Sequence, residues 1–441
     1  MNMRGWRKRS LIILLTLLMF PAKEVHAGRA LELANAQGHN LEERYQPAGS
    51  IVTELNTGMI LWNENADVSW HPASMTKLMS IMLAYDAMKA GKFSLDTEVS
   101  VTEKYADIGS WYVLSNNNMK MGASYTVSEL IELIIVPSSA AATYMLADLV
   151  EPDAAKFVKM MNEKAKEIGM QNTTYYNCVG VTNASLQPYH PDGIPLNSDN
   201  VTTPKDYALL CTYFIQNYPD ILNHTSKVHL VVKEGTPYEE SFDTYQFSLE
   251  GAKYGLQGTD GLKTGSSDTA GFNYSSTAMR GDTRLVEIIM GVSDWTDQTG
   301  EEIRHLVGNA VMEESFSKYE YKCVLPKGEH EVNGEKIVTE KDLWDCVKKN
   351  EPCKFELENK QIQVADKERT FLPGYKAPSV SYRLVSEIRM EKFKHGLIKL
   401  LKIIGTILLV LVLAIVARIG YVYYRRQQRR RRRRNRRNRK K

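Results

Sequence analysis

The feature that most constrains the fold is the division of the strand-forming patterns into an early pair and a late group. Residues 51–55 and 59–62 are short β-rich runs joined by Asn56-Thr57-Gly58, which is a hairpin signal. The late strand patterns cover residues 262–265, 271–279 and 284–292, and helical patterns fill the interval between the two groups. We therefore predict an α/β (α+β) fold in which both ends of one domain build a single sheet, with helices flanking it.

Residues 74–88 form the most apolar of the helical patterns. They are apolar nearly all round, which predicts a buried helix and not one on the surface. A later helix is predicted to begin at Thr203, as the N-cap, with Pro204 in its first turn. Another helix is predicted at about residues 300–316, directly after the late strands.

Two adjacent helical patterns define a joint between them. A capping box at residues 126–129 opens the first helix, and Pro137 ends it because the residue before proline is disfavoured in the helical region. Residues 140–150 form the second pattern. Ser138 and Ser139 are therefore predicted to lie in a tight joint between two helices.

Both ends of the chain have the patterns of targeting segments. Residues 1–27 combine a basic start, an apolar stretch at 11–20 and a small-x-small cleavage site at 25–27, which predicts a signal peptide. The alternative is an uncleaved anchor. Residues 402–424 are long and apolar enough for a transmembrane helix, and the alternative is a helix lying in the membrane interface.

The tail at residues 425–441 contains eleven Arg and two Lys. By the positive-inside rule we expect this tail in the cytoplasm, and therefore the bulk of the chain on the extracytoplasmic side of the cell membrane. Without the +13 of the tail and the +4 of the first 27 residues, residues 28–424 carry a net charge of −13. An acidic folded part argues against a nucleic-acid partner, and anionic lipid explains the tail more simply.

The remaining divisions follow from composition. We predict a main domain at residues 45–320, a small β-rich domain at 321–380 and a juxtamembrane segment at 381–401. Five cysteines leave at least one thiol free in an exported chain, although one pair among Cys323, Cys346 and Cys353 could form a disulfide. The sequence has no zinc, nucleotide or flavin signature, so we expect no metal and no cofactor.

Ser74-Met75-Thr76-Lys77 is an S-x-x-K pattern at the start of the predicted buried helix. Residues three apart share a helix face, so the amine of Lys77 can reach the hydroxyl of Ser74. A serine hydroxyl needs an adjacent base, and lysine serves as one only if burial or nearby positive charge lowers its pKa. The alternative is an N-cap serine beside a solvated lysine.

Lys263-Thr264-Gly265 lies on a predicted strand far downstream. A strand edge that offers a Lys, a hydroxyl and a Gly can bind an extended peptide and its terminal carboxylate. Gly265 permits close approach of another backbone. The alternative is a lysine on a solvated strand face.

Three segments together resemble the low-molecular-mass penicillin-binding proteins, the serine-type D-alanyl-D-alanine carboxypeptidases (peptidase S11-like). Residues 70–79 resemble the family's P-A-S-x-T-K-L-M-T box, and residues 260–272 resemble its D-G-L-K-T-G-x-T-x-x-A-G-Y box. Residues 169–180 are similar to its G-M-x-N-T-x-F-x-N-x-x-G segment. The resemblance covers about residues 45–380, and it implies a penicillin-binding/serine β-lactamase-like fold.

The resemblance implies a role for each motif residue. Ser74 would be the acylated nucleophile and Lys77 its general base. Lys263 and Thr264 would hold the C-terminal carboxylate of a D-Ala-D-Ala peptidoglycan stem peptide, and the backbone N–H groups of Ser74 and Ser266 would form the oxyanion hole. The implied activity is removal of the terminal D-Ala, and β-lactams are implied to acylate Ser74.

The chain departs from the family at the third motif, S-x-N, which corresponds to Ser138-Ser139-Ala140. Ser138 is placed to pass a proton to the leaving amine, but Ala140 replaces the Asn. Loss of one such polar contact costs about 2–4 kcal/mol of transition-state stabilisation, by analogy with a lost oxyanion-hole donor. A weakly active or inactive peptidoglycan-binding scaffold is therefore the main alternative. A β-lactamase is another, although the deacylating Glu motif of class A enzymes is missing.

Overall fold

The structure is a computed structural model that describes residues 29–438. The predicted signal peptide at residues 1–27 lies outside the described residues. The chain forms two compact units. The first contains the residues up to Thr53, Ile60–Arg280 and Leu285–Ser317, and the second contains Glu54–Met59, Gly281–Arg284 and the chain from Lys318 onward.

The main sheet of the first unit combines the early and late strands, as predicted. Its strands are β1 (Gly49–Glu54), β2 (Met59–Glu64), β7 (Thr259–Ser267), β8 (Gly271–Arg280) and β9 (Thr283–Val292), in the order β2-β1-β9-β8-β7. The hairpin pairs β1 with β2 antiparallel, and β7 pairs with β8 antiparallel. The early hairpin therefore lies beside β9, although the two are far apart in the chain.

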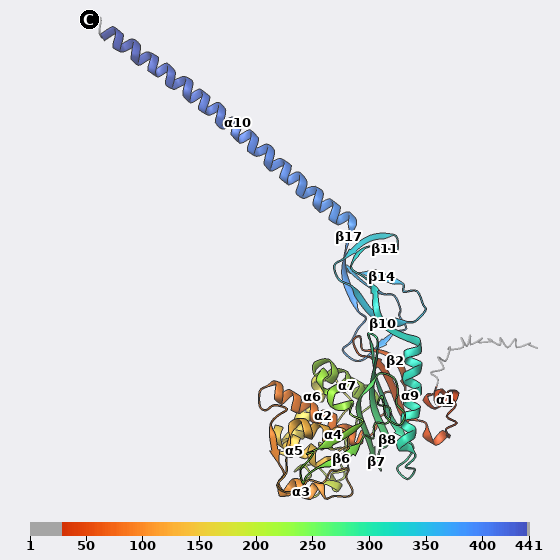
Figure 1. Ribbon diagram of the computed structural model, residues 1–441. Coiled ribbons are helices and arrows are strands. Elements are labelled where there is room, and N and C mark those ends of the chain that lie inside the picture. Colours follow the sequence, from red (N-terminus) through yellow and green to blue (C-terminus); the bar gives the residue numbers. More distant parts are fainter. Residues whose placement is uncertain (1–28, 439–441) are drawn as a thin grey trace, which may run out of the picture. The chain divides into compact units, whose positions relative to one another are not determined.

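Helices cover both faces of this sheet (Figure 1). One face carries α1 (Ala30–Ala36) and α9 (Gly300–Lys318). The other face carries the helical part of the unit, formed by α2 (Lys77–Lys89), α3 (Glu103–Gly109), α4 (Val127–Ile135), α5 (Ala140–Val150), α6 (Ala154–Ile168), α7 (Pro204–Asn217) and α8 (Leu222–Thr225). Two small hairpins belong to this part, β3 (Glu98–Ser100) with β4 (Ser124–Thr126) and β5 (His229–Val232) with β6 (Glu240–Asp243).

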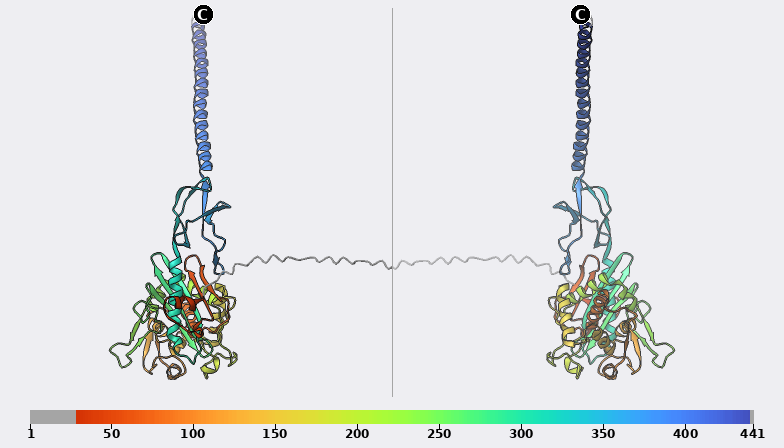
Figure 2. Two further views of the ribbon diagram at one scale, coloured as in Figure 1. Left: turned by 90° about the vertical axis from the view of Figure 1, so that its right-hand side faces the viewer. Right: turned by 90° about the vertical axis from the view of Figure 1, so that its left-hand side faces the viewer.

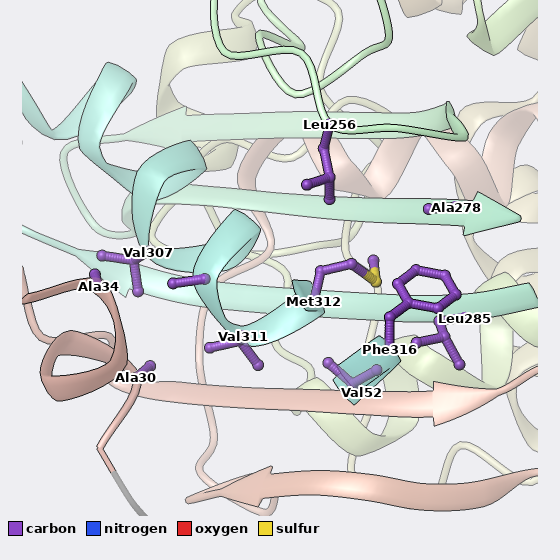
Figure 3. Packing of buried hydrophobic residues seen from close by; sticks show 11 residues of the cluster. Ala30, Ala34, Val52, Leu256, Ala278, Leu285, Val307, Val311, Met312 and Phe316 are labelled. Atoms are coloured by element: carbon purple, nitrogen blue, oxygen red, sulfur yellow. The ribbon is translucent and has the colours of Figure 1, made fainter. Parts of the chain in front are cut away.

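One apolar core joins α9 to the sheet (Figure 3). Val307, Val311 and Phe316 of α9 face Val52 of β1 and Leu285 of β9, and all of these side chains are buried. Val307 and Val311 are four residues apart, so they lie on one face of the helix, toward the sheet. This packing fixes α9 against β1 and β9.

Helices α4 and α7 of the other face begin where the sequence predicts. Thr126 Oγ1 accepts a hydrogen bond from the N–H of Glu129, and the Glu129 carboxylate accepts one from the N–H of Thr126, which confirms the capping box. Thr203 caps α7 by accepting from the N–H of Asp206. Helix α2 is buried over almost its whole circumference, since only Asp86, Met88 and Lys89 of its residues are not buried.

The second unit begins with a β-rich part. Its strands are β10 (Tyr319–Leu325), β11 (Gly328–Val332), β12 (Glu335–Thr339), β13 (Leu343–Lys348), β14 (Phe355–Glu358), β15 (Gln361–Val364), β16 (Thr370–Phe371) and β17 (Ser379–Leu384). One sheet has the order β11-β12-β17-β15-β14, and β10 pairs with β13. Leu325, Ile337, Leu343 and Ile362 form its apolar core. All five cysteines are free, so the disulfide considered for Cys323, Cys346 or Cys353 is not formed.

Helix α10 (Val385–Asn438) follows β17 and continues unbroken through the apolar segment (Figure 2). It is long and apolar enough to cross a membrane, and its most apolar stretch is not buried. An exposed apolar helix of this length suggests membrane anchoring. The segment 381–401 is thus the end of a strand followed by the start of this helix, and the basic tail is helical as far as it is described.

Candidate active site

Ser74 and Lys77 lie on the turn that leads into α2. Residues Ala73–Thr76 form a 3₁₀ turn, so the buried helix predicted from residue 74 becomes α-helical only at Lys77. A 3₁₀ turn places side chains three residues apart directly above each other. The Nζ of Lys77 accordingly lies 3.0 Å from the Oγ of Ser74. The two residues of the S-x-x-K pattern are therefore in hydrogen-bonding contact.

Ser138 meets the same amine from the joint between α4 and α5. Its carbonyl oxygen lies 2.6 Å from the Nζ of Lys77 and its Oγ lies 3.2 Å from it. Ser138 has a φ of +61°, a left-handed conformation that is uncommon and strained for a residue with a side chain. This conformation turns both oxygens of one residue toward Lys77.

Burial gives Lys77 the property that a base requires. The side chain is 2 % exposed, which excludes the alternative of a solvated lysine. Desolvation disfavours the ammonium form and lowers the pKa of Lys77 to about 7. A substantial fraction of the amine is therefore neutral near physiological pH and can accept a proton from Ser74.

Lys263 and Thr264 lie on β7, which passes against the Ser74 turn. A Cβ at Gly265 would lie 2.5 Å from the carbonyl oxygen of Pro72 and 2.9 Å from the N of Met75, so only glycine permits this approach. Lys263 is 1 % exposed and its Nζ donates to the carbonyl of Thr264 at 3.1 Å, so it is not a lysine on a solvated face. Desolvation first, and then repulsion by Lys77 and Arg304, hold the pKa of Lys263 well below its usual value.

Arg304 is a member of the site that sequence reasoning missed. It is 0 % exposed, and its Nη1 donates to the Oγ of Ser266 at 2.8 Å and to the carbonyl of Asn273 at 3.1 Å. Burial lowers the pKa of Arg304 to about 10, which still leaves it charged at neutral pH. Arg304 thus fixes the side chain of Ser266 and places a positive charge beside Lys263. No motif marks it, since it is one charged residue on α9.

The missing Asn of the third motif does not leave Lys77 without partners. Ala140 is buried as the first residue of α5, with 1 % of its surface exposed. Lys77 already contacts Ser74 and both oxygens of Ser138, which matches the three hydrogens of an ammonium group. The replacement therefore removes a polar group from the site without disrupting the orientation of Lys77.

Gly180, from the third segment of the family resemblance, packs against the turn that carries Ser74 and gives a direct test of the position of that turn. A Cβ at Gly180 would lie 1.8 Å from the carbonyl oxygen of Ala73, whereas Gly169 has a similar φ and nothing within 4 Å. We expect Gly169→Ala to cost about 1–2 kcal/mol of unfolding free energy, the cost of the left-handed backbone alone. Gly180→Ala should cost about 1–3 kcal/mol more through overpacking. Chemical denaturation measures both costs, and equal effects of the two variants would contradict the packing argument.

Within residues 29–438, no three His, Cys, Asp or Glu side chains gather in a way that could hold a metal ion. The histidines near the site make structural contacts. His71 Nδ1 lies 2.9 Å from the carbonyl of Asn200, and His305 lies 3.0 Å from the Oγ of Ser248 with both side chains fully buried. The serine hydroxyls and the lysine amine that meet at Lys77 can perform acid–base and nucleophilic chemistry.

The fold is that of the penicillin-binding proteins. The structure of the Streptococcus pneumoniae peptidoglycan synthesis regulatory factor (PBP3) matches with a TM-score of 0.65 at 22% identity, over 77% of this chain and 99% of that one. Penicillin-binding protein D2 of Listeria monocytogenes in its cefotaxime-bound form matches with a TM-score of 0.51 at 27% identity, over 63% of this chain and 99% of that one.

Sequence comparison gives the family within this class. Residues 39–294 match the family model of D-alanyl-D-alanine carboxypeptidases, peptidase S11, so the chain belongs to this family of serine peptidases. It is 25% identical to D-alanyl-D-alanine carboxypeptidase DacF of Bacillus subtilis over 63% of this chain and 64% of that protein. It is 29% identical to DacA of Escherichia coli over 55% of each. The matches thus span between about half and two thirds of these relatives. Residues 321–383 match a domain of unknown function (DUF1958).

Proposed function

We propose that this chain is a serine D-alanyl-D-alanine carboxypeptidase that removes the terminal D-Ala from peptidoglycan stem pentapeptides through an acyl-enzyme on Ser74. The observation that carries the proposal is the buried Lys77 amine, with a pKa of about 7, at 3.0 Å from the Oγ of Ser74. General-base catalysis needs a group with this reach and with a pKa near the working pH. Membership of the carboxypeptidase family supports the substrate.

In the proposed first step, the lone pair of neutral Lys77 takes the proton of Ser74 as its Oγ attacks the carbonyl carbon of the penultimate D-Ala. The carbonyl of Ser138 can only accept hydrogen bonds, so it engages an N–H of Lys77 and helps to direct the lone pair to Ser74. The oxyanion that forms is stabilised by the backbone N–H groups of Ser74 and Ser266.

Collapse of the tetrahedral intermediate breaks the C–N bond and releases the terminal D-Ala. Its amine takes a proton that passes from the Lys77 ammonium through the hydroxyl of Ser138, which lies 3.2 Å from Nζ. Water then attacks the ester on Ser74, and the hydroxyl of Ser74 is restored. A β-lactam enters the same first step, but its amine remains attached to the acyl-enzyme.

Lys263 and Thr264 are proposed to hold the substrate's terminal carboxylate. The free site holds the two amines of Lys77 and Lys263 and the charge of Arg304 in one buried region, and mutual repulsion disfavours charge on Lys263. An incoming carboxylate raises the pKa of Lys263 and so favours the ammonium form that binds it.

The catalytic domain, proposed at residues 45–320, would act outside the cell membrane. We place a signal peptide at residues 1–27, the membrane span at 402–424 and the basic tail at 425–441 on the cytoplasmic side, where anionic lipid attracts it. The small β domain at 321–380 and the juxtamembrane segment at 381–401 would connect the catalytic domain to the span.

A second candidate function is recognition of stem peptides with little turnover, and Ala140 is the observation that favours it. One experiment separates the two. The full-length chain in detergent is incubated with fluorescent penicillin and, separately, with a D-Ala-D-Ala pentapeptide, alongside Ser74→Ala. Label and D-Ala release that both depend on Ser74 support the carboxypeptidase. Label without release favours the recognition protein, and neither signal in the wild type contradicts an acyl-enzyme altogether.

A further inference from the structure

A loop outside the three motifs, at residues 115–118, holds the joint that carries Ser138. The carbonyl of Ser115 accepts from the N–H of Ala140 at 2.9 Å, and Asn116 Oδ1 accepts from the N–H of Ala141 at 2.9 Å. Asn117 Oδ1 accepts from the Oγ of Ser139 at 2.7 Å. Three consecutive residues of the loop therefore bind Ser139 and the first two residues of α5.

These contacts surround the strained residue without touching it. Ser139 is 0 % exposed, its N–H donates to the carbonyl of Leu133 at 2.8 Å, and its Oγ also caps α5 by accepting from the N–H of Ala142 at 3.1 Å. Ser138 is thus held directly before a fixed residue, in the left-handed conformation that turns its two oxygens to Lys77. The strained conformation of Ser138 is maintained because several hydrogen bonds fix the neighbouring Ser139.

Glu240 of β6 determines which way the amide of Asn117 points. The Asn117 Nδ2 donates to Glu240 Oε2 at 3.1 Å, and the N–H of Asn118 donates to Glu240 Oε1 at 2.9 Å. An ionised carboxylate only accepts, so the NH₂ of Asn117 faces Glu240 and its oxygen faces Ser139. Asn117 is 3 % exposed, so no water competes freely for these bonds.

We propose that Asn117 and Glu240 are positioning residues for the reaction: through Ser139 they hold Ser138 in the conformation that presents its carbonyl and hydroxyl to Lys77. The inference rests on the proposed function. Ala140, the third residue of the S-x-N motif, has no polar side chain that could orient Ser138. The loop and Glu240 therefore supply an orientation that comes from outside the motif.

Exchanging the amide and the carboxylate between the two positions tests this. Asn117→Asp alone sets two carboxylates against each other. Glu240→Gln alone sets its NH₂ group against a donor, which is either the NH₂ of Asn117 or the N–H of Asn118. In the double variant Asn117→Asp/Glu240→Gln, the carboxylate introduced at position 117 can accept from both Ser139 and the amide introduced at position 240. The oxygen of that amide accepts from the N–H of Asn118, so the double variant recreates the bonding pattern and the net charge of the wild type. Asn118→Asp is the matched control, because it adds the same charge on an exposed side chain.

The readout is the second-order rate of Ser74 acylation by fluorescent penicillin, with the full-length chain and a thermal unfolding curve for each variant. We expect Asn117→Asp to slow acylation at neutral pH by at least about 10-fold, since a shift of a reacting group by about 1 Å can cost ~10²-fold. The double variant should return to within about 3-fold of the wild type, well inside the ~10²-fold loss that such misplacement can cause, and Asn118→Asp should match the wild type.

The outcomes separate the inference from the proposed function. A wild type that is not labelled, or a label that survives Ser74→Ala, overturns the proposed function. A labelled wild type with Asn117→Asp at the same rate overturns only the positioning role. Slow acylation that the double variant does not rescue also overturns it, because it indicates general damage to the fold, which the unfolding curves would report.

Discussion

Replacing Lys77 with methionine is expected to slow acylation of Ser74 by about 10²–10⁴-fold, the range that general-base catalysis contributes. Methionine has a similar length and is apolar, so it fills the same buried space without a proton acceptor. Ser74 keeps its place on the 3₁₀ turn but loses the amine 3.0 Å away. The measurement is the second-order rate of fluorescent-penicillin labelling at several penicillin concentrations.

The same variant should be at least as stable as the wild type at neutral pH. Burial lowers the pKa of Lys77 to about 7 from the usual 10.5 of lysine, which means that the folded state disfavours a charge that the unfolded chain holds freely. Methionine removes this cost, although the carbonyl of Ser138 loses a donor. Slow labelling with an unchanged or raised melting temperature supports the base. Slow labelling with a large fall in the melting temperature would point to damaged packing instead.

The pH dependence of wild-type acylation follows from the same pKa. Only the neutral amine can take the proton of Ser74, and the amine is neutral above its pKa. The rate should therefore rise about tenfold per pH unit below about pH 7 and level off above it. Stopped-flow labelling between pH 5 and pH 9 tests this, with buffer ionic strength held constant. A midpoint near the ordinary lysine pKa would mean that Lys77 is solvated in solution.

Much of the fold could be predicted because local patterns and the tertiary structure agree. The side chains of Thr126 and Thr203 accept hydrogen bonds from backbone N–H groups at the starts of α4 and α7, as their local sequences predict. The late strands also lie where their sequence patterns predict them. The Ser74–Lys77 contact could also be predicted, since residues three apart on a helical turn meet whatever the rest of the chain does. The short 3₁₀ turn at its start could not, because α and 3₁₀ turns have the same apolar pattern over four residues.

The contacts that could not be predicted join segments whose sequences carry no shared pattern. Arg304 meets Ser266 only because α9 packs against the sheet to which β7 belongs. Asn117 and Glu240 lie 123 residues apart and meet because a small hairpin returns to the loop before α4. The three consecutive asparagines were visible in the sequence, but only the structure shows that the middle one is buried and bound to the Ser138 joint.

Replacing Lys263 with methionine is expected to lower kcat/KM for D-Ala-D-Ala peptides by about 30- to 1000-fold, because truncating one partner of a buried charge pair costs about 2–4 kcal/mol. Lys263 is 1 % exposed, so a bound carboxylate would find little water to replace the lost ammonium.

A matched change in the substrate decides whether Lys263 acts on the carboxylate. A stem peptide amidated at its C-terminus has no terminal carboxylate, so the wild type should process it more slowly than the acid by a factor similar to the loss in Lys263→Met. The variant should treat the acid and the amide almost alike, because the interaction is already absent, and the two changes then combine less than additively.

If the variant still prefers the acid by the wild-type factor, the carboxylate is held by another group, and the charged Arg304 behind Ser266 becomes the residue to replace next. If acid and amide are processed equally by the wild type itself, the site does not recognise a terminal carboxylate, and the stem peptide must be bound through its other groups.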